Sequence, residues 1–257
     1  MTEKDILQHL RTKTFGKTIY VFDTIDSTNT FAKSLAQQDF DVGTLVIAEE
    51  QTKGRGRFGR SWHSQKEKNL TFSLLIKPTI TPKQIGILSL YGGLAVVEAI
   101  KKIAHITPDC KWPNDVLLKG KKVCGILSES VVSQNKLAAV ILGIGLNVNQ
   151  TEFPPEIRRT AASLLLSTGK SIDRFQVLSA VLEQLELFYE KIQSGKLNEI
   201  IQLWRQHTTM LGKQVTVDQQ GKILKGTAKE VADDGGLILR SNGIDIKVLA
   251  GDVTIIQ

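Results

Sequence analysis

Cysteine is scarce in this chain. Its 257 residues include only Cys110 and Cys124, which form no CxxC pair, so neither a disulfide framework nor a cysteine-rich zinc site is expected. Long apolar runs are also absent, since no stretch reaches the roughly 18–20 apolar residues that a membrane span requires. The first residues, MTEKDILQHLRTK, lack the apolar core of a secretory signal. These absences predict a cytoplasmic protein with no membrane partner.

Several catalytic motifs are missing as well. There is no G-x-S-x-G turn, so an acyl-serine hydrolase is not expected, and there is no G-x-x-x-x-G-K-[ST] phosphate loop. The histidines show neither an HExxH motif nor paired metal-ligand spacing; they are His9, His63, His105 and His207. The sequence therefore predicts no metal-ligating residues.

The positive charge of the chain lies in two short segments. Lysine and arginine exceed aspartate and glutamate by 33 to 26, which gives a net charge of +7. Residues 51–69 carry six basic side chains against one glutamate, and residues 111–122 carry four lysines against one aspartate. The remainder of the chain is slightly acidic. Charge concentrated in this way favours anion binding at defined places over a generally basic surface.

Hydrophobic periodicity predicts an α+β fold. Strands are expected where apolar residues alternate or run together, and helices where they recur at helical spacing. The expected strands lie at 18–22, 44–50, 69–76, 115–118, 123–129 and 137–149, and the expected helices follow residues 26–29, open at Pro82, and cover 173–194 and 196–210. From Leu211 onward, short alternating strands between glycine and aspartate turns indicate a small all-β barrel. The pattern divides the chain into domains at 1–210 and 211–257.

Residues 54–59, Gly-Arg-Gly-Arg-Phe-Gly, match G-x-G-x-x-G. A dinucleotide-binding turn needs a helix directly after that motif, but the residues that follow, SWHSQKEKNLTFSLL, are polar and then alternating. The run instead favours a flexible loop whose glycines permit close backbone approach and whose arginines offer planar forks to phosphate oxygens. The alternative is a mobile surface loop whose arginines only improve solubility.

Two further clusters are candidates for a site. In residues 111–115, Lys-Trp-Pro-Asn-Asp, the proline restricts the tryptophan to extended geometry and holds the polar side chains in defined directions. A buried tryptophan beside solvated charges is the alternative. Residues 27–29, Ser-Thr-Asn, place two hydroxyls and an amide at a helix start, where simple capping is the alternative.

Five motifs occur in order along the chain: S-T-N at 27–29, E-Q-T-K-G-R-G-R-F-G-R at 50–60, K-W-P-N-D at 111–115, G-I-L-S-E at 125–129 and G-I-G-L-N at 143–147. Together they resemble the biotin–protein ligases, also called biotin–[acetyl-CoA-carboxylase] ligases. The resemblance implies a mixed β-sheet flanked by helices, similar to class II aminoacyl-tRNA synthetases, with an SH3-like C-terminal β-barrel. It also implies two half-reactions: biotin and ATP, with Mg²⁺, give biotinyl-5′-adenylate and pyrophosphate, and a carrier lysine then attacks the adenylate.

The resemblance also implies roles for individual residues. The biotin-binding set is Ser27, Thr28, Asn29, Gln51, Arg55, Gly56, Arg57 and Lys111. Within it, Arg55, Arg57 and Lys111 are the expected catalytic residues, the lysine lying near the biotin carboxylate and the α-phosphate. Further members of the ATP and adenylate pocket are Trp62, Asn114, Gly125 and Asn147.

The implied partner is a biotin carboxyl carrier protein, the acceptor-lysine domain of a biotin-dependent carboxylase. The catalytic pattern begins by residue 18, which predicts the ligase-only form without the winged helix-turn-helix that many members carry. Nucleic acid is therefore not an expected partner. The sequence is compatible with a homodimer and does not determine the oligomeric state.

Two other functions remain as alternatives. A lipoate–protein ligase shares the fold and reaction type, although the G-R-G-R and K-W-P-N-D pair argues against it. A nucleic-acid-binding protein would fit the sequence pI near 9.3. However, residues 211–257 balance six basic against six acidic side chains, and the basic segments hold few aromatic residues for stacking beyond Phe58 and Trp62.

Overall fold

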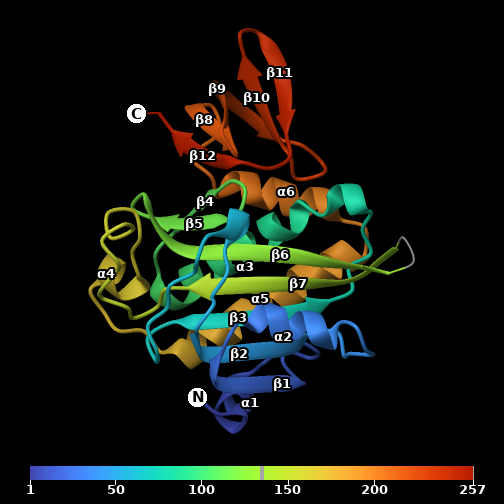
Figure 1. Cartoon of the computed structure of the whole chain (residues 1–257), viewed down its shortest axis with the longest axis vertical. Coiled ribbons are helices and arrows are strands. Elements are labelled where there is room, and N and C mark those ends of the chain that lie inside the picture. Colours follow the sequence, from blue (N-terminus) through green and yellow to red (C-terminus); the bar gives the residue numbers. More distant parts are fainter. Residues whose placement is uncertain (134–135, 257) are drawn as a thin grey trace.

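The computed structural model of this chain describes residues 1–133 and 136–256. Two β-sheets lie one above the other in Figure 1, the larger in the lower part and the smaller at the top. The helices are α1 (Glu3–His9), α2 (Thr28–Leu35), α3 (Ile87–Ala104), α4 (Leu164–Thr168), α5 (Arg174–Gln193) and α6 (Leu197–Gln206), with 3-10 turns η1 (Arg57–Gly59) and η2 (Pro82–Gln84).

The larger sheet is mixed and has seven strands in the order β1-β2-β3-β7-β6-β5-β4. Its strands are β1 (Ile19–Ile25), β2 (Thr44–Gln51), β3 (Leu70–Ile76), β4 (Asp109–Lys111), β5 (Asp115–Leu118), β6 (Lys121–Ser133) and β7 (Lys136–Leu146). β1 and β2 pair in parallel and the other neighbours pair antiparallel. The expected mixed sheet flanked by helices is confirmed.

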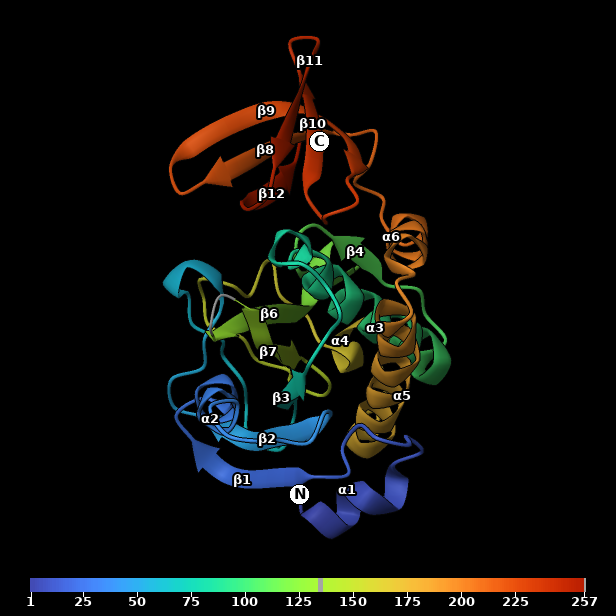
Figure 2. The ribbon, with the colours of Figure 1, turned by 90° about the vertical axis from the view of Figure 1, so that its right-hand side faces the viewer.

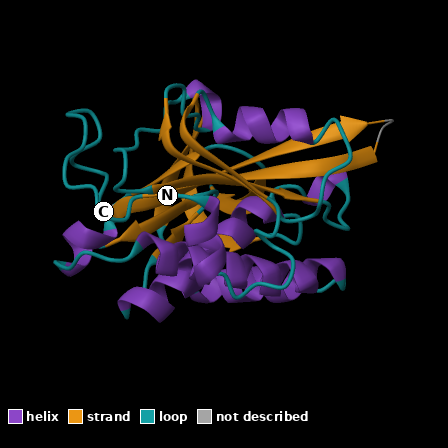
Figure 3. Ribbon diagram, turned by 90° about the horizontal axis from the view of Figure 1, so that it is seen from below, coloured by secondary structure: helices purple, strands orange, loops and turns teal. Residues whose placement is uncertain are grey.

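The two faces of this sheet are covered unequally. Strand residues such as Phe72, Ile126 and Leu142 pack into one large core with α3 and α5. The opposite face is covered at one end by α2, where Ala32 and Ala36 pack on Val46 and Ile141 in a smaller cluster. Figures 2 and 3 show this arrangement, with α3 and α5 on one side of the strands and α2 on the other. The part of the second face beyond α2 is not covered by this helix.

The smaller sheet has five strands in the order β11-β10-β9-β8-β12. They are β8 (Gln214–Gln219), β9 (Lys222–Val231), β10 (Leu237–Ser241), β11 (Ile244–Val248) and β12 (Asp252–Ile255). All its neighbouring strands pair antiparallel. Trp112 ties the two sheets together, because its buried indole Nε1 donates to the carbonyl of Gly235 at 2.9 Å. This sheet is consistent with the predicted small C-terminal β domain.

Local sequence signals account for most element starts, with four differences. Asp173 caps α5 by accepting from Phe175 N, as its residue type predicts. Thr81 and Pro82 open only the 3-10 turn η2, and the α-helix starts later, at Ile87. α1, α4 and β4 were not expected from the pattern, because all three are short, with seven, five and three residues. No helix among the described residues has the length and apolar character to cross a bilayer.

Candidate functional site

Cross-strand register brings the predicted motifs together on the face that α2 leaves uncovered. Lys111 on β4 pairs with Asp115 on β5, Asp115 with Gly125 on β6, and Gly125 with Gly145 on β7. Residues directly opposite each other on neighbouring strands project to the same face. One row across four strands therefore carries a lysine and a carboxylate at one end and two glycines at the other.

The glycines of β6 and β7 make room for two predicted site residues. A Cβ on Gly143 would overlap the side-chain amide of Asn29, which reaches over the sheet from α2. A Cβ on Gly145 would overlap the indole of Trp62, and one on Gly125 would lie 3.2 Å from the same ring. The G-I-G motif is thus explained by side chains lying flat on the sheet, as expected where glycine permits close approach.

Hydroxyl and amide groups form a buried network beside these glycines. Gln51 Oε1 accepts from the backbone N–H of Thr28 at 2.7 Å and lies 3.0 Å from its hydroxyl. Ser73 on β3, which belongs to none of the sequence motifs, lies 2.8 Å from Thr28 Oγ1 and 2.6 Å from Asn29 Oδ1. Thr28, Asn29 and Ser73 are all buried. Neutral donors and acceptors held in this way suit a neutral polar ligand with apolar sides.

Ser27 occupies the N-cap position of α2, but its side chain makes no capping hydrogen bond. It is nonetheless buried, with 2% of its surface exposed. Helix capping by its side chain therefore does not account for this serine.

The Gly- and Arg-rich residues 51–60, called here the Gly/Arg loop, cross this face as a turn closed by backbone hydrogen bonds. Trp62 N donates to Gly54 O at 3.0 Å, and Gly56 N donates to Arg60 O at 2.7 Å. Phe58 takes a positive φ of 55° inside the turn, which explains why no helix opens after the motif. The interpretation as a loop is confirmed.

Arg57 lies between the two sheets. Its Nη1 donates to Asn114 Oδ1 at 3.2 Å and to Gly251 O at 3.3 Å, and it lies 4.0 Å from Asp252, which also pairs with Arg60. Burial lowers the pKa of Arg57, and the carboxylates of Asp252 and Asp115 oppose this shift. Arginine keeps its charge in proteins, so this half-buried cation is available to an anionic ligand.

A lysine outside the five sequence motifs, Lys122, also lies at the glycine row. Lys122 Nζ is 2.6 Å from Asp115 Oδ1 and 5.7 Å from the centre of the Trp62 ring. Simple alternation from Gly125 would place Lys122 on the opposite face, but the register shifts between Val116 and Leu117. Such a bulge re-aims a side chain, and neither composition nor spacing reveals it.

Lys111 stands at the end of the same row. Among the described residues its side chain has no hydrogen-bond or ion-pair partner, in contrast to the paired Lys122. Both lysines therefore lie on the uncovered face, and they differ in whether a carboxylate already neutralises them.

Asn114 and Asn147 anchor the chain around the row. Asn114 Nδ2 donates to Ile126 O at 2.8 Å, and Asn147 Nδ2 donates to Ala162 O at 3.0 Å. The other amide atom of Asn147, Oδ1, is buried and has no partner among the described residues. A buried acceptor without a donor is costly unless a ligand or water supplies one.

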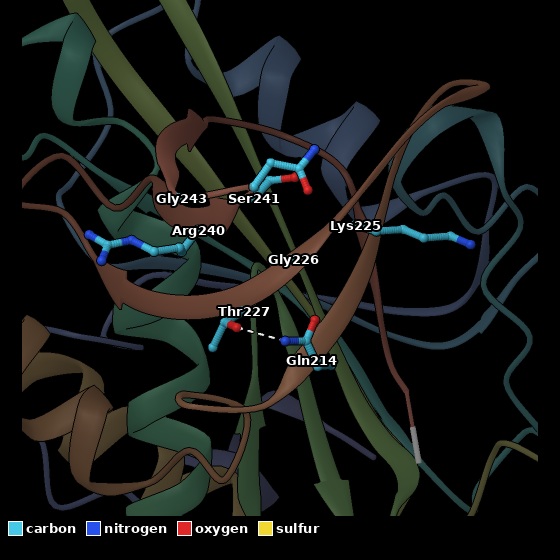
Figure 4. A pocket seen from close by; sticks show the side chains of 8 residues that line it. Gln214, Lys225, Gly226, Thr227, Arg240, Ser241 and Gly243 are labelled. Carbon is cyan, nitrogen blue, oxygen red and sulfur yellow. Dashed lines mark hydrogen bonds between the residues drawn. The ribbon is translucent and has the colours of Figure 1, made fainter.

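A separate hollow in the smaller sheet shares no residue with this site (Figure 4). Its lining includes Arg240, which already pairs with Asp245 at 2.6 Å, and Gln214, which donates to Thr227 at 2.8 Å. Its main cation and amide are therefore already engaged within the protein.

The chain is similar in sequence to known proteins. The sequence model of the Biotin/lipoate A/B protein ligase family matches residues 21–147. The bifunctional ligase/repressor BirA of Bacillus subtilis is 35% identical over 98% of this chain and 78% of its own length. The biotin–[acetyl-CoA-carboxylase] ligase of Mycobacterium tuberculosis is 37% identical over 86% of this chain and 82% of its own length.

Solved structures agree with these sequence matches. The biotin protein ligase from Aquifex aeolicus in complex with biotin and ATP superposes with a TM-score of 0.79 and 33% identity, covering 94% of this chain and 99% of that chain. The range matched by the family model, residues 21–147, includes all five sequence motifs. The chain therefore belongs to the biotin/lipoate A/B protein ligase family, among its biotin protein ligases.

Proposed function

We propose that this protein activates biotin as biotinyl-5′-adenylate and transfers the biotinyl group to a lysine of a biotin carboxyl carrier protein. The observation that carries this proposal is the row from Lys111 to Gly145, bordered by the hydroxyl network and crossed by the Gly/Arg loop. The biotin protein ligase of Aquifex aeolicus, whose structure holds biotin and ATP, supports it.

The chemistry requires cations where two anions meet. The biotin carboxylate is the nucleophile and the α-phosphorus of ATP is the electrophile, and two like charges ~4 Å apart repel by about 4 kcal/mol at an effective dielectric of about 20. Lys122, Lys111 and Arg57 offset this repulsion and stabilise the charge that develops on the phosphate. The protein supplies position and charge, and no protein nucleophile is needed.

The biotin-binding roles fall to the hydroxyl network and the loop. Ser27, Thr28, Asn29 and Gln51 suit the ureido ring, which both donates and accepts hydrogen bonds. Arg55, Gly56 and Arg57 belong to the loop that closes over the carboxylate and the adenylate, which limits hydrolysis.

The adenylate roles fall to the other end of the row. Trp62 provides an aromatic wall over Gly125 and Gly145. The unpartnered Oδ1 of Asn147 is an acceptor for a donor of the nucleotide. Asn114 holds Arg57 in place.

Magnesium fits this site as a companion of ATP. Among the described residues, no group of three His, Cys, Asp or Glu side chains could hold a metal ion. Mg²⁺ is often bound through substrate phosphates with few protein carboxylates. We therefore place Mg²⁺ on the ATP phosphates, where it adds positive charge when bound.

The remaining assignments concern organisation and setting. We place the domain boundary near residue 211, since the second sheet lies between Gln214 and Ile255, and expect that sheet to be SH3-like beside a class II synthetase-like catalytic domain. We also propose that the protein is cytoplasmic and modifies a carrier domain without binding nucleic acid. It acts either as a monomer or as a homodimer.

Labelling assays test the proposal. With ATP and Mg²⁺, the protein is expected to release pyrophosphate with biotin and not with lipoate, and to transfer biotin to a purified carrier domain. Release driven by lipoate alone would assign it to lipoate attachment instead.

Replacing Arg57 by glycine is expected to shorten the lifetime of the adenylate. The change removes the hydrogen bonds that join the loop to Asn114 and Gly251, so the loop no longer excludes water. We expect release of free biotinyl-5′-adenylate to rise by roughly 10-fold or more, since two hydrogen bonds to a charged group are lost.

Chromatography of the reaction products measures this release. Lys53→Gly, an exposed basic residue before the turn, is the control and should retain the adenylate. An unchanged adenylate lifetime in Arg57→Gly would show that the loop does not shield it.

A further inference from the structure

Glu129 lies beside the proposed biotin site and has no role in the reaction described above. It follows Gly125 and Leu127 on β6, and its side chain contacts two site residues. Oε2 accepts from Asn29 Nδ2 at 2.7 Å, and Oε1 pairs with Arg55 Nη2 at 3.2 Å. A carboxylate repels anionic substrates, so its presence in a site for two of them indicates a separate role.

We propose that Glu129 is a positioning residue that orients the biotin pocket through Asn29 and holds the Gly/Arg loop in place through Arg55. This inference rests on the proposed function of the site.

Glu129 fixes the direction in which the Asn29 amide faces. A carboxylate only accepts hydrogen bonds, so the amide nitrogen must point toward it. The amide oxygen of Asn29 then faces the hydroxyl of Ser73 at 2.6 Å and can only accept from it. The single proton of Ser73 is thereby committed to Asn29.

The Thr28 hydroxyl is the next group in this network. It lies 2.8 Å from Ser73 Oγ and donates its own proton to Gln51 Oε1 at 3.0 Å. Gln51 Oε1 also accepts from the backbone N–H of Thr28 at 2.7 Å. The hydroxyl of Thr28 therefore presents lone pairs to the pocket, and the ureido N–H groups of biotin need acceptors of this kind.

The second oxygen of Glu129 connects the same network to the loop. The Arg55 side chain is 50% exposed, and it lies four residues after Gln51 in the chain. A ligand carboxylate or phosphate competes with Glu129 for this arginine. The carboxylate thus holds Arg55 near the site before the anion arrives and releases it afterwards.

Glu129→Gln tests the orienting role because it keeps the shape of the side chain but replaces the carboxylate, which only accepts hydrogen bonds, with an amide that can donate or accept. The direction of the Asn29 amide is then no longer fixed. We expect the KM for biotin in pyrophosphate release to rise on the order of 10- to 100-fold, as for loss of a hydrogen bond to a charged group, with the KM for ATP changed by less than about 2-fold. Glu50→Gln, an exposed carboxylate on β2, is the matched control with wild-type constants. An unaltered KM for biotin, or equal rises for both substrates, would overturn the orienting role.

Trypsin cleavage within residues 51–60 tests the loop contact without substrates. Glu129→Gln is expected to be cleaved about two- to fivefold faster than the unaltered protein, the size expected for a partly exposed ion pair, while Glu50→Gln is not. Equal cleavage rates would overturn the loop role. Arg55→Ala, which leaves the Asn29 contact intact, should leave the thermal midpoint unchanged and separates this effect from misfolding.

The two levels of inference fail in different ways. If the unaltered protein releases no pyrophosphate with biotin and ATP, the proposed function is wrong, and the cleavage comparison still decides the loop contact of Glu129. If the unaltered protein is active and Glu129→Gln matches it in both assays, only the role of Glu129 is wrong.

Discussion

Lys122→Ala is expected to slow biotin-dependent pyrophosphate release by about 10²- to 10³-fold, the usual cost of removing one donor that stabilises transition-state charge. Its ammonium group lies at the glycine row, 2.6 Å from Asp115 and under the Trp62 ring. The substitution also leaves Asp115 as an uncompensated negative charge beside two anionic substrates. Both effects act in the same direction, so the loss should appear in kcat as well as in KM.

Lys111→Ala separates the two lysines of the row. The family resemblance assigns the carboxylate and α-phosphate contact to Lys111, and its position opposite Asp115 keeps it on the same face. We expect this variant also to lose adenylate formation, and Lys121→Ala, an exposed neighbour at the start of β6, to keep it. Near wild-type pyrophosphate release by either Lys111→Ala or Lys122→Ala would remove that lysine from the reaction.

Sequence periodicity predicted most of the larger sheet because its strands are apolar and its helices amphipathic. The core strands β2, β3 and β7 lie close to the ranges expected from their apolar runs. The short elements α1 and β4 were not predicted, since α1 has seven residues and β4 only three. β4 depends on its pairing with β5, which a local pattern does not record, whereas α1 has a local signal in the capping box of Thr2 and Asp5 that its short length obscured.

Motif order predicted where the site would form but not which partners complete it. Thr28 and Asn29 meet through Ser73, which sits inside an ordinary apolar strand, and Gln51 contacts Thr28 directly. Lys122 was missed because a bulge changes its face. Sequence spacing reports neighbours along the chain, whereas these residues are neighbours only across the sheet.

The placement of Asn29 over β7 makes Gly143→Ala a test of the whole biotin pocket. The new methyl group would overlap the Asn29 amide, which cannot move freely because Ser73 and Glu129 hold both of its polar atoms. Overpacking of this kind costs about 1–3 kcal/mol, and the displaced amide no longer faces the ligand. We expect biotin affinity measured by titration calorimetry to fall by roughly 10²-fold.

Two controls distinguish a displaced amide from a damaged fold in Gly143→Ala. Gly93→Ala on α3 faces only Ile126 and Val116 at 3.9 Å, so it should bind biotin normally. In an Asn29→Ala background the overlap is gone, so the loss of unfolding free energy caused by Gly143→Ala should shrink, as coupled neighbours require. Wild-type biotin affinity in Gly143→Ala would mean that biotin does not lie against Asn29, and an undiminished stability loss in the double variant would mean that the methyl group meets another part of the chain.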